Sequence, residues 1–259
     1  MSRHTVFAEA DSVIFKGARI SGRVGENLYD NDVNNLNGTI SLQLDPSEKF
    51  TAVLSYEHLD IIDKEQPFLG NPIYNHVVTI GSVGLNIRTN DYSAWLNYRP
   101  FERVYLTGEW VYGDYSDGNR KQSYMLESGY ILKRTPRVRL SYNYFYLDYQ
   151  NPAPVYTENQ QRQSAYYDPI NFEVHTLRLE YRNETSRRFS YGAEEAVSFI
   201  PKSNGFSNSF FVFGAVEFNK NHKLRLDGRI FYQNKGIDRI GKTGYFDAKN
   251  VSLSYEYRF

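Results

Sequence analysis

The feature that most constrains what this chain can fold into is a period-two alternation of apolar and polar residues. It is clearest in the last segment, where one series consists of Val251, Leu253, Tyr255, Tyr257 and Phe259 and the other of Ser252, Ser254, Glu256 and Arg258. Successive side chains of a β-strand point to opposite faces of a sheet, so this pattern predicts a strand with one apolar and one polar face. Helical periodicity is nearly absent from the sequence, which favours an all-β fold.

The alternation recurs along the rest of the chain. Apolar or aromatic residues occupy every second position through most of four further segments, residues 92–98, 104–112, 138–146 and 224–232. Candidate strands near 5–15, 17–26, 37–45, 50–59, 76–88 and 91–98, with seven or eight more after them, give about fourteen strands, an even number, with sixteen as the alternative. The stretch from His58 to His76 is too long for the short turn expected there, which leaves a missed or split strand open at that point.

The same alternation occurs in two kinds of protein. In a soluble β-sandwich the apolar face packs on a core, whereas in a membrane β-barrel the apolar face meets lipid. Three features favour the barrel: strands of roughly ten residues, Tyr and Trp near the segment ends, and connections of two alternating lengths. The 23 tyrosines and 17 phenylalanines, at a mean hydropathy of −0.60, suit strands with two different faces. No apolar run approaches the ~18 to 20 residues that a membrane-spanning helix needs.

The connections between the predicted strands alternate in length. Short ones are expected at residues 99–103, 133–137, 183–187 and 219–222, as in periplasmic turns. Longer polar ones are expected at 113–122, 150–170, 201–207 and 234–250, as in external loops. We therefore predict a single domain over residues 1–259, a transmembrane antiparallel up-and-down β-barrel in the bacterial outer membrane.

Charge and motif content exclude several functional classes. Lys plus Arg and Asp plus Glu are both 30, so no overall field would attract nucleic acid, which is not expected as a partner. The chain has no cysteine, which excludes disulfides, thiolate metal sites and a cysteine nucleophile. None of the five histidines, His4, His58, His76, His175 and His222, lies in a familiar catalytic string, and the sequence contains no phosphate-binding glycine loop. The sequence therefore predicts neither an enzyme nor a cofactor.

One polar segment has the residue types of a calcium loop. Asp114, Asp117 and Asn119 would provide oxygen ligands, but the further ligands and the closing Glu of such a loop are missing. A polar turn is the better interpretation, and no metal site is expected.

The polar faces of the predicted strands carry the candidates for lining a pore. These are Glu109, Arg137, Arg139, Asn143, Arg178, Glu180, Arg182, Arg225, Asp227, Arg229, Glu256 and Arg258. Both signs of charge are present. Such a lumen suits a hydrated path for a bulky polar solute, and it equally suits a network of structural contacts that props the barrel open or closed.

Three segments carry a resemblance to a known family. They are DYSDGNR at 114–120, the Tyr-rich segment YNYFYLDY at 142–149, and AYYDPINFEVHTLRLEYR from Ala165. Over roughly residues 104–259 the chain resembles the porin-like barrel that follows a tetratricopeptide-repeat domain in bacterial exopolysaccharide secretion proteins, the exporters of cellulose and poly-N-acetylglucosamine. The resemblance implies an external-loop motif at Tyr166, Tyr167, Asp168 and Pro169. Phe259 resembles the terminal signal that the barrel-assembly machinery reads.

The resemblance implies a passive conduit. A polymer made at the inner membrane would thread the barrel past polar and aromatic groups that make weak, repeated contacts. The implied partners are outer-membrane lipid, the polysaccharide chain, periplasmic repeat-protein or synthase components, and the barrel-assembly machinery. Two alternatives remain open: a structural or scaffold barrel with a closed lumen that pairs with periplasmic or surface proteins, and an outer-membrane enzyme with an inward Ser or His pair.

Overall fold

The structure, a computed structural model, describes residues 3–29, 34–60, 86–151, 170–184, 188–219, 221–237 and 243–257. Within these ranges the elements are thirteen β-strands and one short 3-10 helix, η3 (Pro201–Ser203). The strands are β1 (Arg3–Phe15), β2 (Ala18–Tyr29), β3 (Asn34–Ser47), β4 (Phe50–Asp60), β5 (Arg88–Phe101), β6 (Val104–Tyr115), β7 (Arg120–Lys133), β8 (Arg137–Tyr149), β9 (Phe172–Asn183), β10 (Phe189–Ile200), β11 (Gly205–Asn219), β12 (His222–Ile237) and β13 (Thr243–Tyr257). No helix in these ranges is long and apolar enough to cross a membrane.

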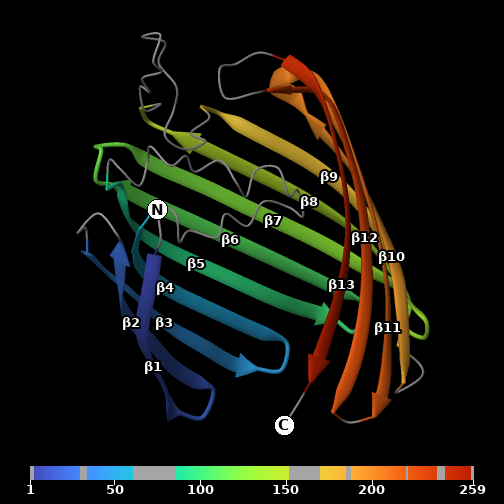
Figure 1. The fold of residues 1–259 in the computed structure, drawn as a ribbon, viewed down its shortest axis with the longest axis horizontal. Coiled ribbons are helices and arrows are strands. Elements are labelled where there is room, and N and C mark those ends of the chain that lie inside the picture. The colour runs from blue at the N-terminus through green and yellow to red at the C-terminus, as the bar shows by residue number, and fades with distance from the viewer. Residues whose placement is uncertain are drawn as a thin grey trace. The chain divides into compact units, whose positions relative to one another are not determined.

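The strands form one sheet in which each strand pairs with the next along the chain, from β1 to β13 (Figure 1). Neighbours run antiparallel, as β1 does with β2 and β12 with β13. The all-β, up-and-down arrangement predicted from the alternation is confirmed. The described residues contribute thirteen strands, against about fourteen predicted, and the strand order leaves β1 and β13 as its two ends.

The position of β5 bears on the possibility that a strand was missed or split in the stretch after His58. β4 pairs directly with β5, from Phe50 opposite Tyr98 to Asp60 opposite Arg88. The strand predicted at 91–98 is therefore the middle of the longer strand Arg88–Phe101. The strand predicted at 76–88 falls largely outside the described residues, as does most of the long stretch from His58 to His76.

The connections are shorter than the sequence suggested. The turns predicted within 99–103, 133–137 and 219–222 are present, but three of the four connections predicted to be long are also brief. Only residues 116–119 separate β6 from β7, 201–204 separate β10 from β11, and 238–242 separate β12 from β13. The prediction was wrong there because polar residues at strand ends were assigned to loops, although strand pairing continues through them, as at Ser207, which pairs with Ser198 and with Gln233.

The chain forms two compact units that divide the middle strands between them. The amino-terminal unit comprises Met1–Arg99, Thr107–Met125 and Tyr146–Phe172, and so contains β1–β4 with parts of β5–β8. The carboxy-terminal unit comprises Pro100–Leu106, Leu126–Phe145 and Glu173–Phe259, and so contains the other parts of those strands and nearly all of β9–β13.

Burial in both units is the reverse of that in a soluble sheet. In β3 of the amino-terminal unit Asn35 is 5% exposed, whereas its neighbour Leu36 is 61% exposed. In β9 of the carboxy-terminal unit Glu180 is 1% exposed, whereas Leu177 is 54% exposed. Exposed apolar side chains on one face and buried polar ones on the other are the arrangement of strands that meet lipid, since water would favour the opposite. Burial thus favours the membrane β-barrel over the soluble β-sandwich, two folds that periodicity alone could not distinguish.

Candidate functional site

Most of the predicted pore-lining residues share one face of the strands, called here the polar face. In the carboxy-terminal unit the register aligns Glu180, Glu194, Phe211, Arg229 and Asn250 in one row across β9–β13. Paired residues of neighbouring strands point to the same side, so the row and the residues two positions away on each strand define this face. The predicted residues that lie on it in this unit are Arg137, Arg139, Asn143, Arg178, Glu180, Arg182, Arg225, Asp227, Arg229 and Glu256.

Two predicted residues lie elsewhere. Glu109 belongs to the amino-terminal unit, two positions along β6 from Thr107, which accepts a hydrogen bond from Asn97. Arg258 is outside the described residues. Asn143 is on the polar face but only 3% exposed, and neither atom of its amide has a hydrogen-bond partner within the described part of the chain.

Glu180 is the centre of an ion-pair cluster. Arg137 Nη2 lies 2.6 Å and Arg182 Nε 2.7 Å from its Oε1, and Arg139 contacts its Oε2. The side chain of Glu180 is 2% exposed, whereas those of Arg137 and Arg182 are 40% and 39% exposed. Three guanidinium groups thus surround one buried carboxylate, whose single negative charge cannot neutralise their three positive charges.

Further arginines extend this cluster across the polar face. Arg178 Nε lies 3.3 Å from Glu194 Oε1, and Arg225 Nη2 lies 2.7 Å from Asp227 Oδ1. The whole group, called the arginine cluster below, consists of Arg137, Arg139, Arg178, Arg182, Arg225 and Arg229 with Glu180, Glu194 and Asp227.

Aromatic rings lie among these arginines on the same face. The guanidinium carbons of Arg182 and Arg225 lie 5.6 and 4.8 Å from the ring centroid of Phe213. That of Arg229 lies 5.2 Å from Phe211, whose ring stacks on Phe213 at 6.0 Å. Guanidinium groups are attracted to ring faces at these distances, so the aromatic residues help to hold the arginines in place. Phe211 and Phe213 were not among the predicted pore-lining residues, although their positions in the alternation place them opposite the apolar series of β11.

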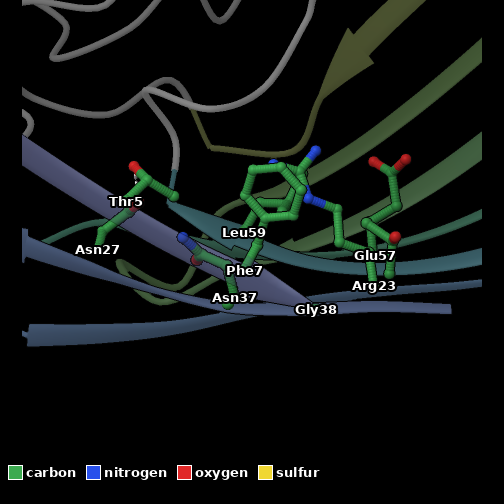
Figure 2. Close-up of a pocket in the computed structure, with 10 residues that line it drawn as sticks. Thr5, Phe7, Arg23, Asn27, Asn37, Gly38, Glu57 and Leu59 are labelled. Atoms are coloured by element: carbon green, nitrogen blue, oxygen red, sulfur yellow. Dashed lines mark hydrogen bonds between the residues drawn. The ribbon is translucent and has the colours of Figure 1, made fainter. Parts of the chain in front are cut away.

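The polar face of the amino-terminal unit contains a cavity of about 390 Å³. Figure 2 shows Phe7, Arg23 and Glu57 projecting from the same side of β1, β2 and β4. Arg23 lies over the ring of Phe7, 3.9 Å from its centroid. The remaining lining is small or polar and consists of Thr5, Gly25, Asn27, Asn37, Gly38, Thr39 and Leu59. An aromatic residue at a polar position of β1, between Thr5 and Glu9, was the sequence signal that could have identified this place.

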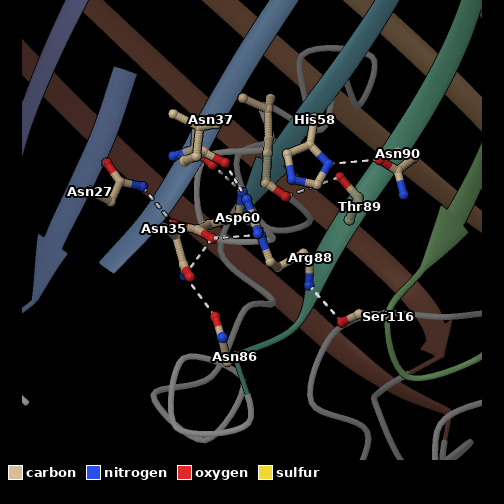
Figure 3. A network of polar contacts seen from close by, with 12 residues as sticks. Asn27, Asn35, Asn37, His58, Asp60, Asn86, Arg88, Thr89, Asn90 and Ser116 are labelled. Atoms are coloured by element: carbon tan, nitrogen blue, oxygen red, sulfur yellow. Dashed lines mark hydrogen bonds and ion pairs between the residues drawn. The ribbon is translucent and has the colours of Figure 1, made fainter. Parts of the chain in front are cut away.

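A buried polar network holds the ends of β2, β3 and β4 together (Figure 3). The carboxylate of Asp60 accepts hydrogen bonds from Asn27 Nδ2 at 2.6 Å and Asn35 Nδ2 at 2.7 Å. The backbone N–H of Asp60 donates to Asn37 Oδ1 at 3.0 Å, and Asn35 also donates to Asn86 Oδ1 at 2.6 Å. A buried carboxylate bonded in this way fixes strand positions, so we assign this network to structure.

The two units differ in the charge of their polar faces. Among the side chains that the structure describes in the amino-terminal unit, six acidic residues lie there, Glu9, Asp11, Asp45, Glu57, Asp91 and Glu109, against four basic ones, Arg19, Arg23, Arg99 and Lys121. Lys121 Nζ lies 2.6 Å from Asp91 Oδ2. The arginine cluster gives the polar face of the carboxy-terminal unit a positive local charge.

The segments that carried the family resemblance are partly described. DYSDGNR contains the β6–β7 turn, where Gly118 has a φ of +85° and the Asn119 N–H donates to Asp117 Oδ1 at 3.1 Å. In the Tyr-rich strand β8, Tyr142 and Tyr146 lie on the apolar face and hydrogen-bond to His175 Nδ1 and Asn171 Oδ1. No group of three or more metal-binding side chains occurs in the described ranges. The external-loop motif Tyr166, Tyr167, Asp168 and Pro169, and the terminal Phe259, lie outside those ranges.

Solved structures share this fold. A structure named "Bacterial polysaccharide outer membrane secretin" aligns with 99% of this chain and 80% of its own, with a TM-score of 0.74 and 14% identity. The chain has the fold of outer-membrane β-barrel proteins. The outer membrane channel DcaP of Acinetobacter baumannii aligns with 98% of the chain and 84% of its own, with a TM-score of 0.50 and 6% identity. Comparison with protein-family models and with curated proteins gives no match.

Proposed function

We propose that this chain is an outer-membrane pore through which an exopolysaccharide leaves the cell. The observation that carries the proposal is the reversed burial of the sheet: exposed apolar side chains cover one face, and charged, amide and aromatic side chains occupy the other. A face of this kind provides a hydrated path through a layer of lipid.

The choice of polysaccharide as the transported molecule has three further supports. The solved structure with the TM-score of 0.74 is named for a polysaccharide. The segments at 114–120 and 142–149 and the segment from Ala165 resemble the barrels of exopolysaccharide secretion proteins. Rings beside guanidinium groups, as at Phe211 and Phe213, suit the apolar faces and hydroxyl groups of sugars.

The proposed transport is passive, with energy supplied by synthesis of the polymer. A useful path binds weakly at many places, because one tight site would hold the chain. No covalent step is required, and no enzyme activity is proposed. The partners we propose are outer-membrane lipid, the polymer, a periplasmic repeat protein or synthase component, and the barrel-assembly machinery.

The test is the ionic conductance of the purified protein in a planar lipid bilayer. Folding is established first by the shift in gel migration that boiling produces in detergent-folded barrels. We expect stepwise conductance, and interruption of the current when fragments of the transported polysaccharide are added on one side.

A folded protein that never conducts would contradict the proposal and support a closed structural barrel instead. The buried contacts around Asp60 and Glu180 are the observation that favours this second candidate, since both tie neighbouring strands together across the polar face.

A further inference from the structure

We infer that the arginine cluster is a binding site for the carboxylate groups of an acidic polysaccharide, so that the transported polymer contains uronic acid or similar units. The inference deepens the proposed function and rests on it. It concerns the polar face of the carboxy-terminal unit alone, where arginines and aromatic rings from β8, β9, β11 and β12 occur together.

The arginine cluster contains an excess of positive charge. Five of its guanidinium groups contact three carboxylates, a formal surplus of two positive charges. This surplus is concentrated at Glu180, where one carboxylate receives Arg137, Arg139 and Arg182. Like charges held this close repel one another unless a further anion lies between them, so the arrangement favours an anionic ligand.

The arginines beside Glu180 keep donor capacity for a ligand. Arg137 contacts Glu180 through Nη2 and Arg182 through Nε, and their side chains remain 40% and 39% exposed. A guanidinium group has five N–H donors in a planar fork that matches the two oxygens of a carboxylate. The contacts with Glu180, Glu194 and Asp227 show that carboxylates fit these arginines.

Aromatic rings lie beside these charges. Phe213 lies between Arg182 and Arg225, and Phe211 lies beside Arg229. An acidic sugar presents an apolar ring face and a carboxylate, which this alternation of rings and guanidinium groups matches. A small inorganic anion has no apolar surface that would pack on the rings.

Further acidic residues lie on this face. Glu127 accepts a hydrogen bond from Tyr105, whose ring lies 5.2 Å from the guanidinium carbon of Arg139. Glu217 pairs in register with Lys223, and Lys223 with Glu256, near the β11–β12 turn. The excess of guanidinium groups over carboxylates is greatest at Glu180, where three guanidinium groups contact one carboxylate.

The experiment measures binding of three oligosaccharides of equal length to the full chain, folded in detergent, by titration calorimetry. The probes are an oligomer of a uronic acid, a neutral oligomer of glucose and a cationic oligomer of glucosamine. Binding is measured without a bilayer, so a failure here is distinct from a failure to conduct. We expect the uronic acid oligomer to bind about ten-fold more tightly than the neutral one at low salt, and this preference to shrink at about 0.5 M salt.

The decisive variant is Arg137→Gln/Arg182→Gln. It leaves Arg139 on Glu180, so the buried carboxylate keeps one partner while two positive charges are lost. The matched control, Arg134→Gln/Lys249→Gln, removes two charges away from the polar face: Arg134 contacts the exposed Glu102, and Lys249 pairs with Ile230 on the apolar face. We expect the first variant to lose most of the preference and the control to keep it, with the same heat-induced gel shift in both.

Three results would overturn the inference. They are equal binding of the neutral oligomer, tighter binding of the cationic oligomer, and an undiminished preference in folded Arg137→Gln/Arg182→Gln. The cationic probe is included because the polar face of the amino-terminal unit is acidic. Tighter binding of the cationic oligomer would identify that unit as the binding surface.

Discussion

Glu180 shows how one residue can determine the local arrangement of a sheet face. Its carboxylate is buried and carries the contacts of Arg137, Arg139 and Arg182, which come from two strands. Without its charge the three guanidinium groups would face one another with no carboxylate between them. Removing one partner from a buried ion pair is strongly destabilising for this reason.

We therefore expect Glu180→Gln to lower the free energy of unfolding by about 3 kcal/mol, measured by urea titration in lipid vesicles. Glu102→Gln is the matched control, because Glu102 also contacts an arginine, Arg134, but is 83% exposed. Solvent screens that pair, so the control should change stability by about 0.5 kcal/mol. Equal effects of the two substitutions would show that the contacts of Glu180 do not stabilise the fold.

At the scale of elements, glycines on two strands have opposite surroundings. A Cβ built on Gly129 of β7 would lie 2.1 Å from Cε1 of Tyr105 on β6, whereas one built on Gly214 of β11 would meet nothing within 4 Å. The Tyr105 hydroxyl donates to Glu127, which is two positions from Gly129 on β7. Gly129 thus leaves the space that the ring needs to lie across the neighbouring strand.

Gly129→Ala is expected to displace the ring of Tyr105 and to destabilise the protein by about 2 kcal/mol, as overpacking does. Gly214→Ala adds the same methyl group where there is room, and should leave stability unchanged or slightly raised. Chemical unfolding of both variants in the same detergent measures the difference. A tolerated Gly129→Ala would mean that the ring of Tyr105 can move aside without cost.

At the scale of the whole molecule, the apolar faces decide between lipid and water as the surroundings. Leu226 on β12 is 53% exposed and pairs in register with Leu253, while Ser252 pairs with Asp227 on the polar face. In water an exposed leucine tolerates a charge, whereas at the centre of a bilayer an arginine facing lipid is costly.

Leu226→Arg should therefore reduce stability in lipid vesicles by about 2 to 4 kcal/mol and slow insertion, with the loss smaller near a membrane interface. Ser252→Arg, about one level away on the polar face, should stay within about 0.5 kcal/mol of the parent. Urea unfolding and the heat-induced gel shift report both effects. Similar stability of the two variants would contradict membrane residence of this face.

The alternation of the sequence was sufficient for the strands and for their two faces, because side-chain direction in a strand depends only on position. Arg178, Glu180 and Arg182 could be assigned to one face from this rule alone, and the register agrees. Loop lengths were less predictable. The polar residues around Asp114 and Asn119 belong to strand ends and a tight turn, because backbone pairing is indifferent to the polarity of side chains.

Only the tertiary structure decided which polar residues meet. Arg137 and Glu180 are 43 residues apart, and their contact follows from the placement of β8 beside β9, which no local pattern encodes. The same holds for Phe7 and Arg23, and for Asp60 with Asn27 and Asn35. Periodicity determined the face of each side chain, because side-chain direction is a local property of the strand backbone. Pairing and register determined which side chains are neighbours. They therefore determined the arginine cluster and the burial that distinguishes a face toward lipid from a core.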